Sequence, residues 1–298
     1  MKKLLFIYNC HAGRQKARNS LADMLDVFAR EGYEITAHPT QCRGDATRTA
    51  AASRGYDRVV CCGGDGTLNE TVTGLMQIPQ EERPVLGYIP TGSANDFARN
   101  VDLPKTLAEM AEVACGGTPK ACDLGLMNGQ YFTYVAAFGL FTKVSYATSQ
   151  TNKNLLGHFA YVLGGAGELT NIPSYHVKVE TSDGVVTEGD YIYGMVGNTV
   201  SVGGLVKLPR DQIQLDDGLF EVILLKKPKT PKDLQDILNA LTTQKMTSGR
   251  VVEGFTARKV TFTADRELAW TVDGEFGGNH AVTTIENLQR TFVLACGK

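Results

Sequence analysis

The chain has 298 residues, of which 43% are hydrophobic and 21% are charged, and its formal net charge at pH 7 is −2. This length and composition predict a globular protein with a substantial core, divided into two domains. A net charge so close to zero excludes long-range attraction of the whole chain to nucleic acid or anionic lipid, and we expect no nucleic-acid partner. The seven cysteines are odd in number and lack metal-ligand spacing, which favours reduced thiols in a cytoplasmic protein.

The first part of the chain alternates between strand and helix patterns. Strands are expected at residues 3–8, 33–37, 58–62 and 84–89. Helices are expected at about residues 21–31, 45–54, 68–76, 94–99 and 106–115. This order predicts a parallel sheet with helices on both faces, and in such sheets ligands bind beyond the carboxyl ends of the strands.

From about residue 120 the pattern becomes antiparallel. Asn128-Gly129 and Ser182-Asp183-Gly184 each separate two apolar runs and predict hairpins. The flanking strands are expected at residues 121–127, 131–137, 175–180 and 185–194, further strands at 219–225, 259–263, 268–272 and 290–296, and helices at 155–169 and 231–242. We therefore predict an α/β domain at residues 1–120, with 286–298 as a candidate final strand, and a mainly antiparallel β-sandwich at residues 121–285.

Two glycine-rich turns carry the chemistry, at residues 63–70 (GGDGTLNE) and 90–97 (PTGSANDF), each between an expected strand and an expected helix. Glycine lets backbone N–H groups approach phosphate oxygens closely, and a helix N-terminus adds positive potential. A carboxylate beside phosphates repels them unless a divalent cation lies between, so Asp65 is expected to bind Mg²⁺ or its water. For a single glycine turn, an ordinary strand-to-helix connection is the alternative.

These motifs resemble a known family. The GGDGT sequence at residues 63–67 is shared by NAD kinases, 6-phosphofructokinase-like proteins and the diacylglycerol kinase catalytic-domain family, and residues 90–97 resemble a motif of the last group. Similar segments at residues 9–13, 122–125, 215–219 and 273–275 extend the likeness over essentially the full length. The resemblance implies an NAD kinase/phosphofructokinase-like N-terminal domain, a C-terminal β-sandwich, and ATP with Mg²⁺ in the cleft between them.

The same resemblance implies the site residues. The implied nucleotide contacts are Asn9, Thr40, Gly63, Gly64, Asp65, Gly66, Thr67, Leu68, Asn69, Ser93 and Asn95. Glu275 is implied as the general base that accepts the proton of the attacking hydroxyl, with Asp65 as the second catalytic residue. Alternation along residues 268–275, taken as one strand, places Glu275 on the face of Asp273. Local sequence alone favours a hairpin turn with a solvated glutamate, and the match to the family's Asp-Gly-Glu ending reverses that preference.

The family also implies a second Mg²⁺ at the carboxylate of Asp217, with the backbone carbonyls of Gln214 and Leu219; a simple turn before a strand is the alternative. Asp96 and Asp123 are candidate members of an acidic network, and Arg14 and Arg99 are candidate counter-charges. The alternative, in which Asp96 is only an acid at a helix N-terminus and the two arginines are solvated surface groups, is given equal weight. The chain departs from the family in having Asn9-Cys10 for Asn-Pro, and in lacking a lysine near Gly164 that some members place there.

The expected function is an ATP- and Mg²⁺-dependent lipid kinase that transfers the γ-phosphate to the hydroxyl of diacylglycerol or a related lipid alcohol. The alternatives are a soluble-substrate kinase of the NAD kinase type and an ATP-binding protein without catalysis. Expected partners are ATP, the lipid alcohol and, transiently, a membrane surface. Such a protein would be cytoplasmic or peripheral at the inner face of the membrane, because no apolar run is long enough to cross a bilayer. The oligomeric state is open, a homodimer included.

Overall fold

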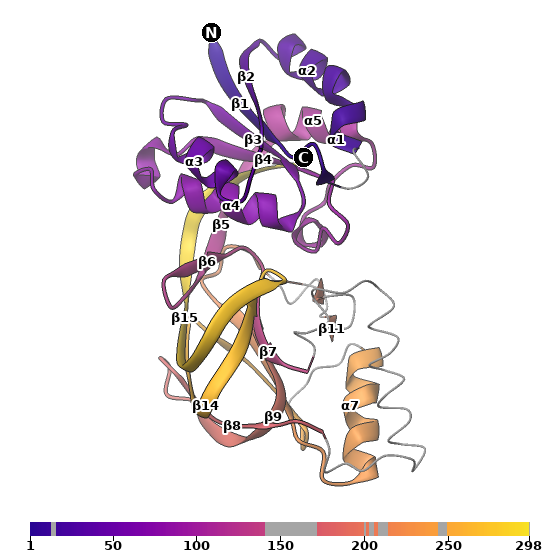
Figure 1. Ribbon diagram of the computed structural model, residues 1–298, viewed down its shortest axis with the longest axis vertical. Coiled ribbons are helices and arrows are strands. Elements are labelled where there is room, and N and C mark those ends of the chain that lie inside the picture. The colour runs from indigo at the N-terminus through magenta and orange to yellow at the C-terminus, as the bar shows by residue number, and fades with distance from the viewer. Residues whose placement is uncertain are drawn as a thin grey trace. The chain divides into compact units, whose positions relative to one another are not determined.

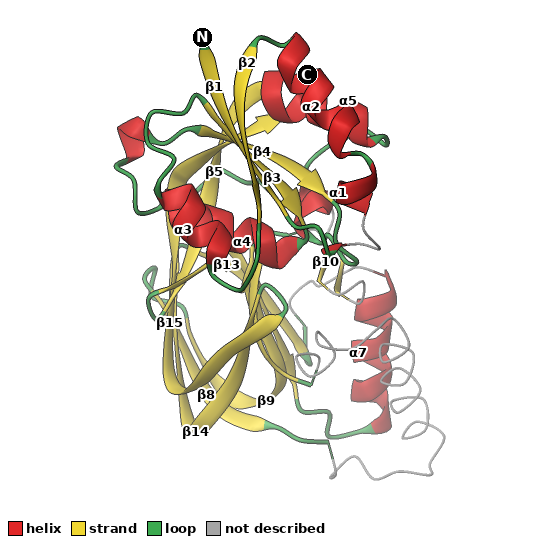
Figure 2. Cartoon of the chain, turned by 45° about the horizontal axis from the view of Figure 1, so that its top comes forward, coloured by secondary structure: helices red, strands yellow, loops and turns green. Residues whose placement is uncertain are grey.

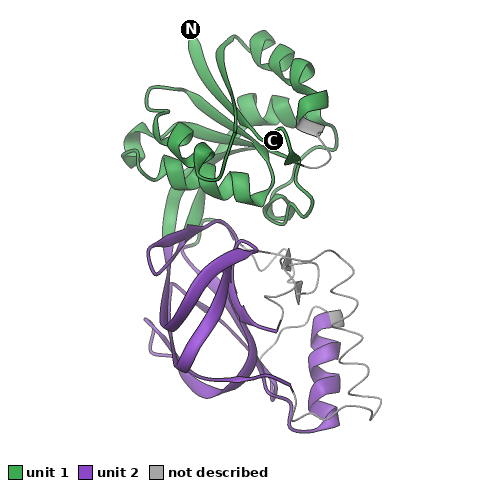
Figure 3. Cartoon of the chain, in the orientation of Figure 1, with its two compact units in different colours: residues 1–124, 215–217, 288–298 green, residues 125–214, 218–287 purple. Residues whose placement is uncertain are grey.

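The computed structural model describes residues 1–12, 16–140, 172–199, 201–202, 206–207, 214–243 and 249–297. The chain forms two compact units (Figures 1 and 3). Unit 1 comprises Met1–Leu124, Leu215–Asp217 and Leu288–Lys298, and unit 2 comprises Gly125–Gln214 and Gly218–Asn287. Two long strands, β5 (Thr118–Met127) and β15 (Glu275–Cys296), contribute residues to both units.

Unit 1 is built on a parallel sheet, as the sequence predicts. Its strands are β1 (Lys2–Tyr8), β2 (Tyr33–Pro39), β3 (Arg58–Gly63) and β4 (Val85–Pro90). They lie in the order β4-β3-β1-β2, and Leu294 near the end of β15 pairs in parallel with Leu86 of β4. Every residue of β3 is buried, which is the pattern of a strand covered on both faces.

Helices cover both faces of this sheet. They are α1 (Lys16–Asn19), α2 (Leu21–Arg30), α3 (Asp45–Ala51), α4 (Asp65–Leu75) and α5 (Leu107–Gly116), with 3₁₀ helices η2 (Gln80–Glu82) and η3 (Phe97–Asn100). In Figure 2, α2 and α5 lie on one face and α3 and α4 on the other. Phe6 of β1 and Phe28 of α2 meet edge to face at 5.2 Å in the core beneath α2 and α5. This confirms the predicted α/β architecture.

Three helix boundaries differ from the sequence-based expectation. Helix α4 begins at Asp65, three residues earlier than expected, because an acidic residue is stabilised in the first turn of a helix. Helix α3 ends at Ala51, where the amide and hydroxyl of Ser53 both donate to the Ala50 carbonyl. The helix expected at residues 94–99 is only the short η3. The capping box of Thr106 and Glu109 starts α5 where it was predicted.

Unit 2 is an antiparallel β structure with one described helix, α7 (Pro231–Thr243). Its strands include β6 (Gln130–Phe132), β7 (Val135–Gly139), β8 (Tyr175–Thr181), β9 (Val186–Gly197), β12 (Phe220–Lys226), β13 (Val252–Ala257) and β14 (Lys259–Val272). They run in the order β13-β12-β9-β7-β14-β15, and β8 pairs with both β9 and β14. The short strands β10 (Ser201–Val202) and β11 (Val206–Lys207) form a separate pair.

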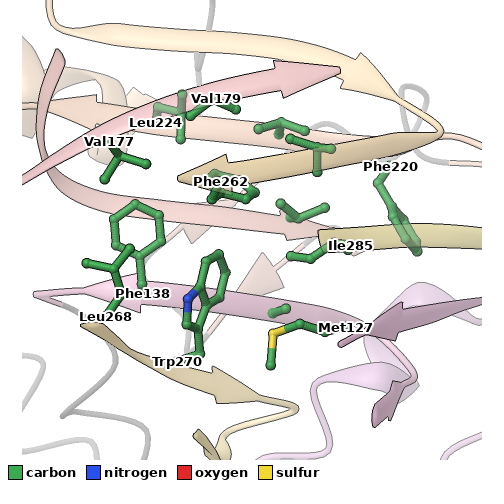
Figure 4. Close-up of a cluster of buried hydrophobic side chains, with 14 of the residues drawn as sticks. Met127, Phe138, Val177, Val179, Phe220, Leu224, Phe262, Leu268, Trp270 and Ile285 are labelled. Carbon is green, nitrogen blue, oxygen red and sulfur yellow. The ribbon is translucent and has the colours of Figure 1, made fainter. Parts of the chain in front are cut away.

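The core of unit 2 is aromatic and aliphatic (Figure 4). Trp270 of β14 lies with its ring centroid 5.0 Å from that of Phe138 and 5.2 Å from that of Phe262. All three side chains are buried, and a buried aromatic side chain of this size contributes about 1.5–3 kcal/mol through the hydrophobic effect. This core packs between β7 and β14, which also pair with each other.

Both predicted hairpins are confirmed, since Asn128-Gly129 joins β5 to β6 and the turn at Gly184 joins β8 to β9. The strand expected at residues 131–137 is divided, because β6 ends at Phe132 and β7 begins at Val135. The strands expected at 259–263 and 268–272 form the single strand β14, with an irregularity between them. The helix expected at 155–169 lies outside the described residues. In the part of the chain that is described, no helix has the length and apolarity needed to span a membrane.

Candidate active site

The two glycine turns of unit 1 touch each other through their backbones. The amide of Thr91, after β4, donates to the Gly63 carbonyl at the end of β3 over 2.9 Å. A Cβ atom on Gly92 would lie 2.5 Å from the Cα of Gly64, and one on Gly64 would lie 3.2 Å from the Cα of Gly92. The glycines are therefore required for close approach of the two turns rather than for flexibility alone.

Asp65 links these turns with its side chain. Its Oδ2 accepts a hydrogen bond of 3.1 Å from the amide of Asp96, and its Oδ1 accepts one of 3.3 Å from the amide of Phe97. Asp96 is buried, and Arg99 Nε lies 3.5 Å from its Oδ1. Asp65 thus orients the second turn, a contact that the sequence did not reveal.

Strands β1 and β2 end at the same edge of the sheet, and the loops that follow them begin there. The amide of Asn9 donates to the Cys62 carbonyl over 2.9 Å, and its Nδ2 lies 3.4 Å from Thr67 Oγ1. The amide of Thr40 donates to the Tyr8 carbonyl over 3.0 Å. The parallel sheet therefore gathers Asn9, Thr40 and Thr67 at the carboxyl ends of its strands.

Glu70, the last residue of the first glycine motif, holds the loop that follows β2. Its Oε1 accepts a hydrogen bond of 2.7 Å from the amide of Gly44, and its carbonyl accepts one of 3.0 Å from Thr47 Oγ1. Gly44 has a left-handed backbone, with φ 77°. Sequence reasoning gave Glu70 no role, although its place within the motif was a signal that could have identified it.

The remaining implied nucleotide contacts differ in accessibility. Ser93 is exposed, and Asn69 and Gly66 are half-buried on α4. Asn95 has a left-handed backbone, with φ 52°, and its Nδ2 donates to the Gly92 carbonyl over 3.0 Å. Leu68 is fully buried, so its side chain offers no surface to a ligand. Its amide donates to the Gly64 carbonyl.

Gly92→Ala is expected to weaken ATP binding and to lower the free energy of unfolding by about 1–3 kcal/mol, because the new methyl group would overlap the Gly64 backbone. Gly116→Ala is the matched control in the same unit, since a Cβ there meets nothing closer than 3.8 Å. Calorimetric ATP titration and thermal unfolding of both variants check this. Equal behaviour of the two variants would contradict the close packing of the turns.

The thiols beneath the first turn are not nucleophiles. Desolvation by burial raises the pKa of Cys61 and of Cys62 to about 12, although hydrogen bonds to Thr71 and Thr91 act in the opposite direction. A thiol with so high a pKa carries almost no thiolate at neutral pH. All seven cysteines are free thiols.

Glu275 belongs to a tight turn in unit 2. Asp273 and Gly274 both have positive φ angles, 48° and 81°, and they join β14 to β15 so that Val272 pairs with Glu275. The sequence argument that treated residues 268–275 as one strand is therefore wrong, because the chain reverses at Asp273-Gly274. Glu275 is exposed at the start of β15, as expected of a hairpin and as accessible as a base must be.

The implied metal ligands are close together in the sequence but are divided between the two units. Asp217 is exposed in the unit 1 segment Leu215–Asp217, whereas Gln214 and Leu219 belong to unit 2. The Leu219 carbonyl accepts a hydrogen bond of 3.1 Å from Asn287 Nδ2. Among the described residues, no group of three or more His, Cys, Asp or Glu side chains could hold a metal. The implied set has one carboxylate and two carbonyls, all hard oxygen donors that suit Mg²⁺.

Asp123 fixes the turn that carries Asp217. Its Oδ1 accepts a hydrogen bond of 2.8 Å from the amide of Arg290, and its own amide donates to the Leu215 carbonyl. Arg290 in turn places its Nη2 3.1 Å from Asp216 Oδ2. Arg14 lies outside the described residues.

An α/β unit with paired glycine turns at its strand ends, followed by an antiparallel β-sandwich, is the architecture of an NAD kinase-like protein. Residues 3–127 match the family model of the diacylglycerol kinase catalytic domain, and residues 135–291 match that of the YegS C-terminal NAD kinase beta sandwich-like domain. The chain therefore belongs to the diacylglycerol kinase catalytic-domain family, and it is an enzyme of the kinase type that defines this family.

Individual relatives support the same family assignment. The chain is 36% identical over 282 residues to a diacylglycerol kinase of Bacillus subtilis, covering 93% of this chain and 91% of that protein. The crystal structure of a diacylglycerol kinase from Bacillus anthracis superposes with a TM-score of 0.76 at 25% identity, covering 99% of this chain and 97% of that one. An NAD kinase from Archaeoglobus fulgidus in complex with ATP has a TM-score of 0.54 at 11% identity over 99% of this chain and 94% of that one, which is a likeness of fold alone.

Proposed function

We propose that this kinase uses ATP and Mg²⁺ to phosphorylate the hydroxyl of diacylglycerol or a related lipid alcohol. The observation that carries the proposal is the Asp65 carboxylate, which joins two glycine turns in contact at the carboxyl ends of β3 and β4. Carboxylates at such a phosphate-binding edge are compatible with a polyphosphate when a divalent cation separates them. The relatives named as diacylglycerol kinases supply the acceptor class.

On the nucleotide side, the turns and the N-terminus of α4 would bind the phosphates through backbone N–H groups. Asn9 and Thr67, whose side chains lie 3.4 Å apart, would contribute polar contacts, and the loop of Thr40 is held in place by Glu70. Asp65 would be the ligand for the nucleotide's Mg²⁺, which supplies charge neutralisation for the β- and γ-phosphates.

In the transfer step, the lipid hydroxyl oxygen forms a bond to the γ-phosphorus while the bond from that phosphorus to the bridging oxygen of ADP breaks. Glu275 accepts the hydroxyl proton, so that the products are ADP, the lipid phosphate and a protonated glutamate. Proton transfer to a positioned base accounts for about 10²–10⁴-fold of the rate, and positioning and electrostatics account for the rest. We also propose a second Mg²⁺ at Asp217, Gln214 and Leu219 with a structural role.

Incubating the protein with γ-labelled ATP and mixed lipid vesicles is expected to transfer label to a lipid, which mass spectrometry of the product would identify. A parallel reaction with NAD in place of lipid is expected to stay unlabelled. Label on NAD alone would favour a soluble-substrate kinase, and ATP binding without transfer in either reaction would favour a protein that has lost catalysis. The lipid acceptor implies transient contact with the inner face of the membrane, which flotation of the protein with the same vesicles tests.

A further inference from the structure

We propose that Asp273 is a positioning residue that fixes the turn presenting Glu275, an inference that rests on the proposed role of Glu275 as the base. Asp273 is only 6% exposed, and both of its carboxylate oxygens are used. Oδ2 accepts hydrogen bonds from the amide of Thr133 at 2.7 Å and from its hydroxyl at 2.8 Å. Oδ1 accepts hydrogen bonds from the amides of Tyr134 at 3.0 Å and Val135 at 3.1 Å.

This contact explains why the chain between β6 and β7 leaves the regular ladder. Three successive amides, those of residues 133–135, all donate to one carboxylate, which a regular strand with alternating N–H directions does not allow. The amide of Asp273 donates back to the Val135 carbonyl over 2.9 Å. The turn is thus bound to the start of β7 from both directions.

The rest of β7 extends this attachment. Its residues Ala136–Phe138 pair with Val272, Thr271 and Trp270 of β14, and Thr271 Oγ1 donates to the Ala137 carbonyl over 3.2 Å. The turn therefore continues the paired and buried end of β14, residues 270–272. Glu275 follows two residues after Asp273, so a shift of the turn would move the carboxylate of Glu275 directly.

A second turn in unit 2 shows that the turn geometry does not itself require a buried acid. Asn128 and Gly129 have φ angles of 46° and 90°, close to those of Asp273 and Gly274. Asn128 is exposed, and its side chain bonds only to the main chain of Val282 and Thr284. Burying a carboxylate costs solvation free energy, which is offset only when its hydrogen bonds are complete. The carboxylate at 273 therefore serves to fix position, because charge-assisted hydrogen bonds are about twice as strong as neutral ones.

Asp273→Asn tests the proposal, because asparagine tolerates the left-handed backbone but turns one acceptor into an N–H₂ donor facing backbone N–H groups. We expect kcat to fall by about 10- to 100-fold, the range for residues that orient a catalytic group, with the KM for ATP unchanged. Asn128→Asp is the matched control, the reverse exchange at the same position of an equivalent turn, and it should keep wild-type kcat. Thr133→Val, which removes only the hydroxyl donor, should give a smaller loss of the same kind and serves if Asp273→Asn does not fold.

Two further measurements separate a role of Asp273 in positioning Glu275 from a role in the stability of the fold alone. In a Glu275→Gln background, Asp273→Asn or Thr133→Val should lower the residual rate less than twofold, because a residue acting through Glu275 loses its effect when the carboxylate is gone. Hydrogen exchange of the amides of residues 274–277, measured by mass spectrometry without substrate, should be faster in Asp273→Asn and unchanged in Asn128→Asp.

The outcomes distinguish the positioning role of Asp273 from the role of Glu275 as the base. An equal loss from the Asp273 or Thr133 substitution in both backgrounds, or wild-type kcat in both single variants, overturns the positioning role and leaves Glu275 as the base. Wild-type kcat in Glu275→Gln overturns the base assignment, and the role of Asp273 falls with it.

Discussion

Glu275→Gln is expected to lower kcat for lipid phosphorylation by about 10³-fold, within the range that a general base contributes. Glutamine keeps the size and the exposed position of the side chain at the start of β15 but cannot accept the hydroxyl proton. ATP binding should be nearly unchanged, because the proposed nucleotide contacts belong to unit 1 and Glu275 belongs to unit 2. Steady-state kinetics with labelled ATP and calorimetric titration of ATP measure the two quantities separately.

Glu267→Gln is the matched control for this experiment. Glu267 is also an exposed glutamate of unit 2, on β14, and the substitution makes the same change of charge. It should leave kcat at the wild-type value. If Glu275→Gln turned over as fast as Glu267→Gln, another residue would have to accept the proton.

Asp65→Asn should also cause a large loss of activity, but for a different reason from Glu275→Gln. The substitution removes the negative charge that would bind the nucleotide's Mg²⁺. It also replaces with an N–H₂ donor one of the two oxygens, each of which accepts from one amide, that of Asp96 or that of Phe97. Leaving one such amide unpaired costs about 1–3 kcal/mol, so the second glycine turn should loosen. We expect kcat/KM for ATP to fall by about 100-fold or more, as when a preorganised electrostatic contact is removed.

The measurement for Asp65→Asn is the Mg²⁺ dependence of ATP affinity, which should be strong in the wild type and in Glu275→Gln but weak in Asp65→Asn. Asp23→Asn is the control, because Asp23 is an exposed acid in the first turn of α2 in the same unit. An unchanged Mg²⁺ dependence in Asp65→Asn would place the cation ligand elsewhere and leave Asp65 with only its structural contacts.

Much of the fold follows from local sequence. Short apolar runs ending in glycine predicted the parallel strands β3 and β4, and Asn128-Gly129 predicted a hairpin where the structure has one. These signals are readable because turn and strand preferences depend on neighbouring residues. Helix boundaries were less accurate, since the end of α3 depends on how Ser53 bonds to Ala50.

The candidate site could be anticipated only in part. Asp65 and Glu275 stand in motifs, so their chemistry could be proposed from sequence, although Glu275 lies beyond a reversal that strand alternation missed. The contacts of Glu70 and Asp273 could not be assigned, although both residues stand in motifs, because their partners, Gly44 and Thr133, are distant along the chain. An Asp-Gly pair gives the same turn signal whether its carboxylate is solvated or buried.

The sequence by itself determined the class of enzyme, the parallel and antiparallel halves, and the two glycine turns proposed to bind phosphate, because each depends on residues that are close together in the chain. Only the tertiary structure decided which side chains fix those turns. Asp65 reaches the amides of Asp96 and Phe97, and Asp273 reaches Thr133, 140 residues away. A buried carboxylate is stable only when distant parts of the chain complete its hydrogen bonds, and that condition is met in three dimensions rather than in sequence.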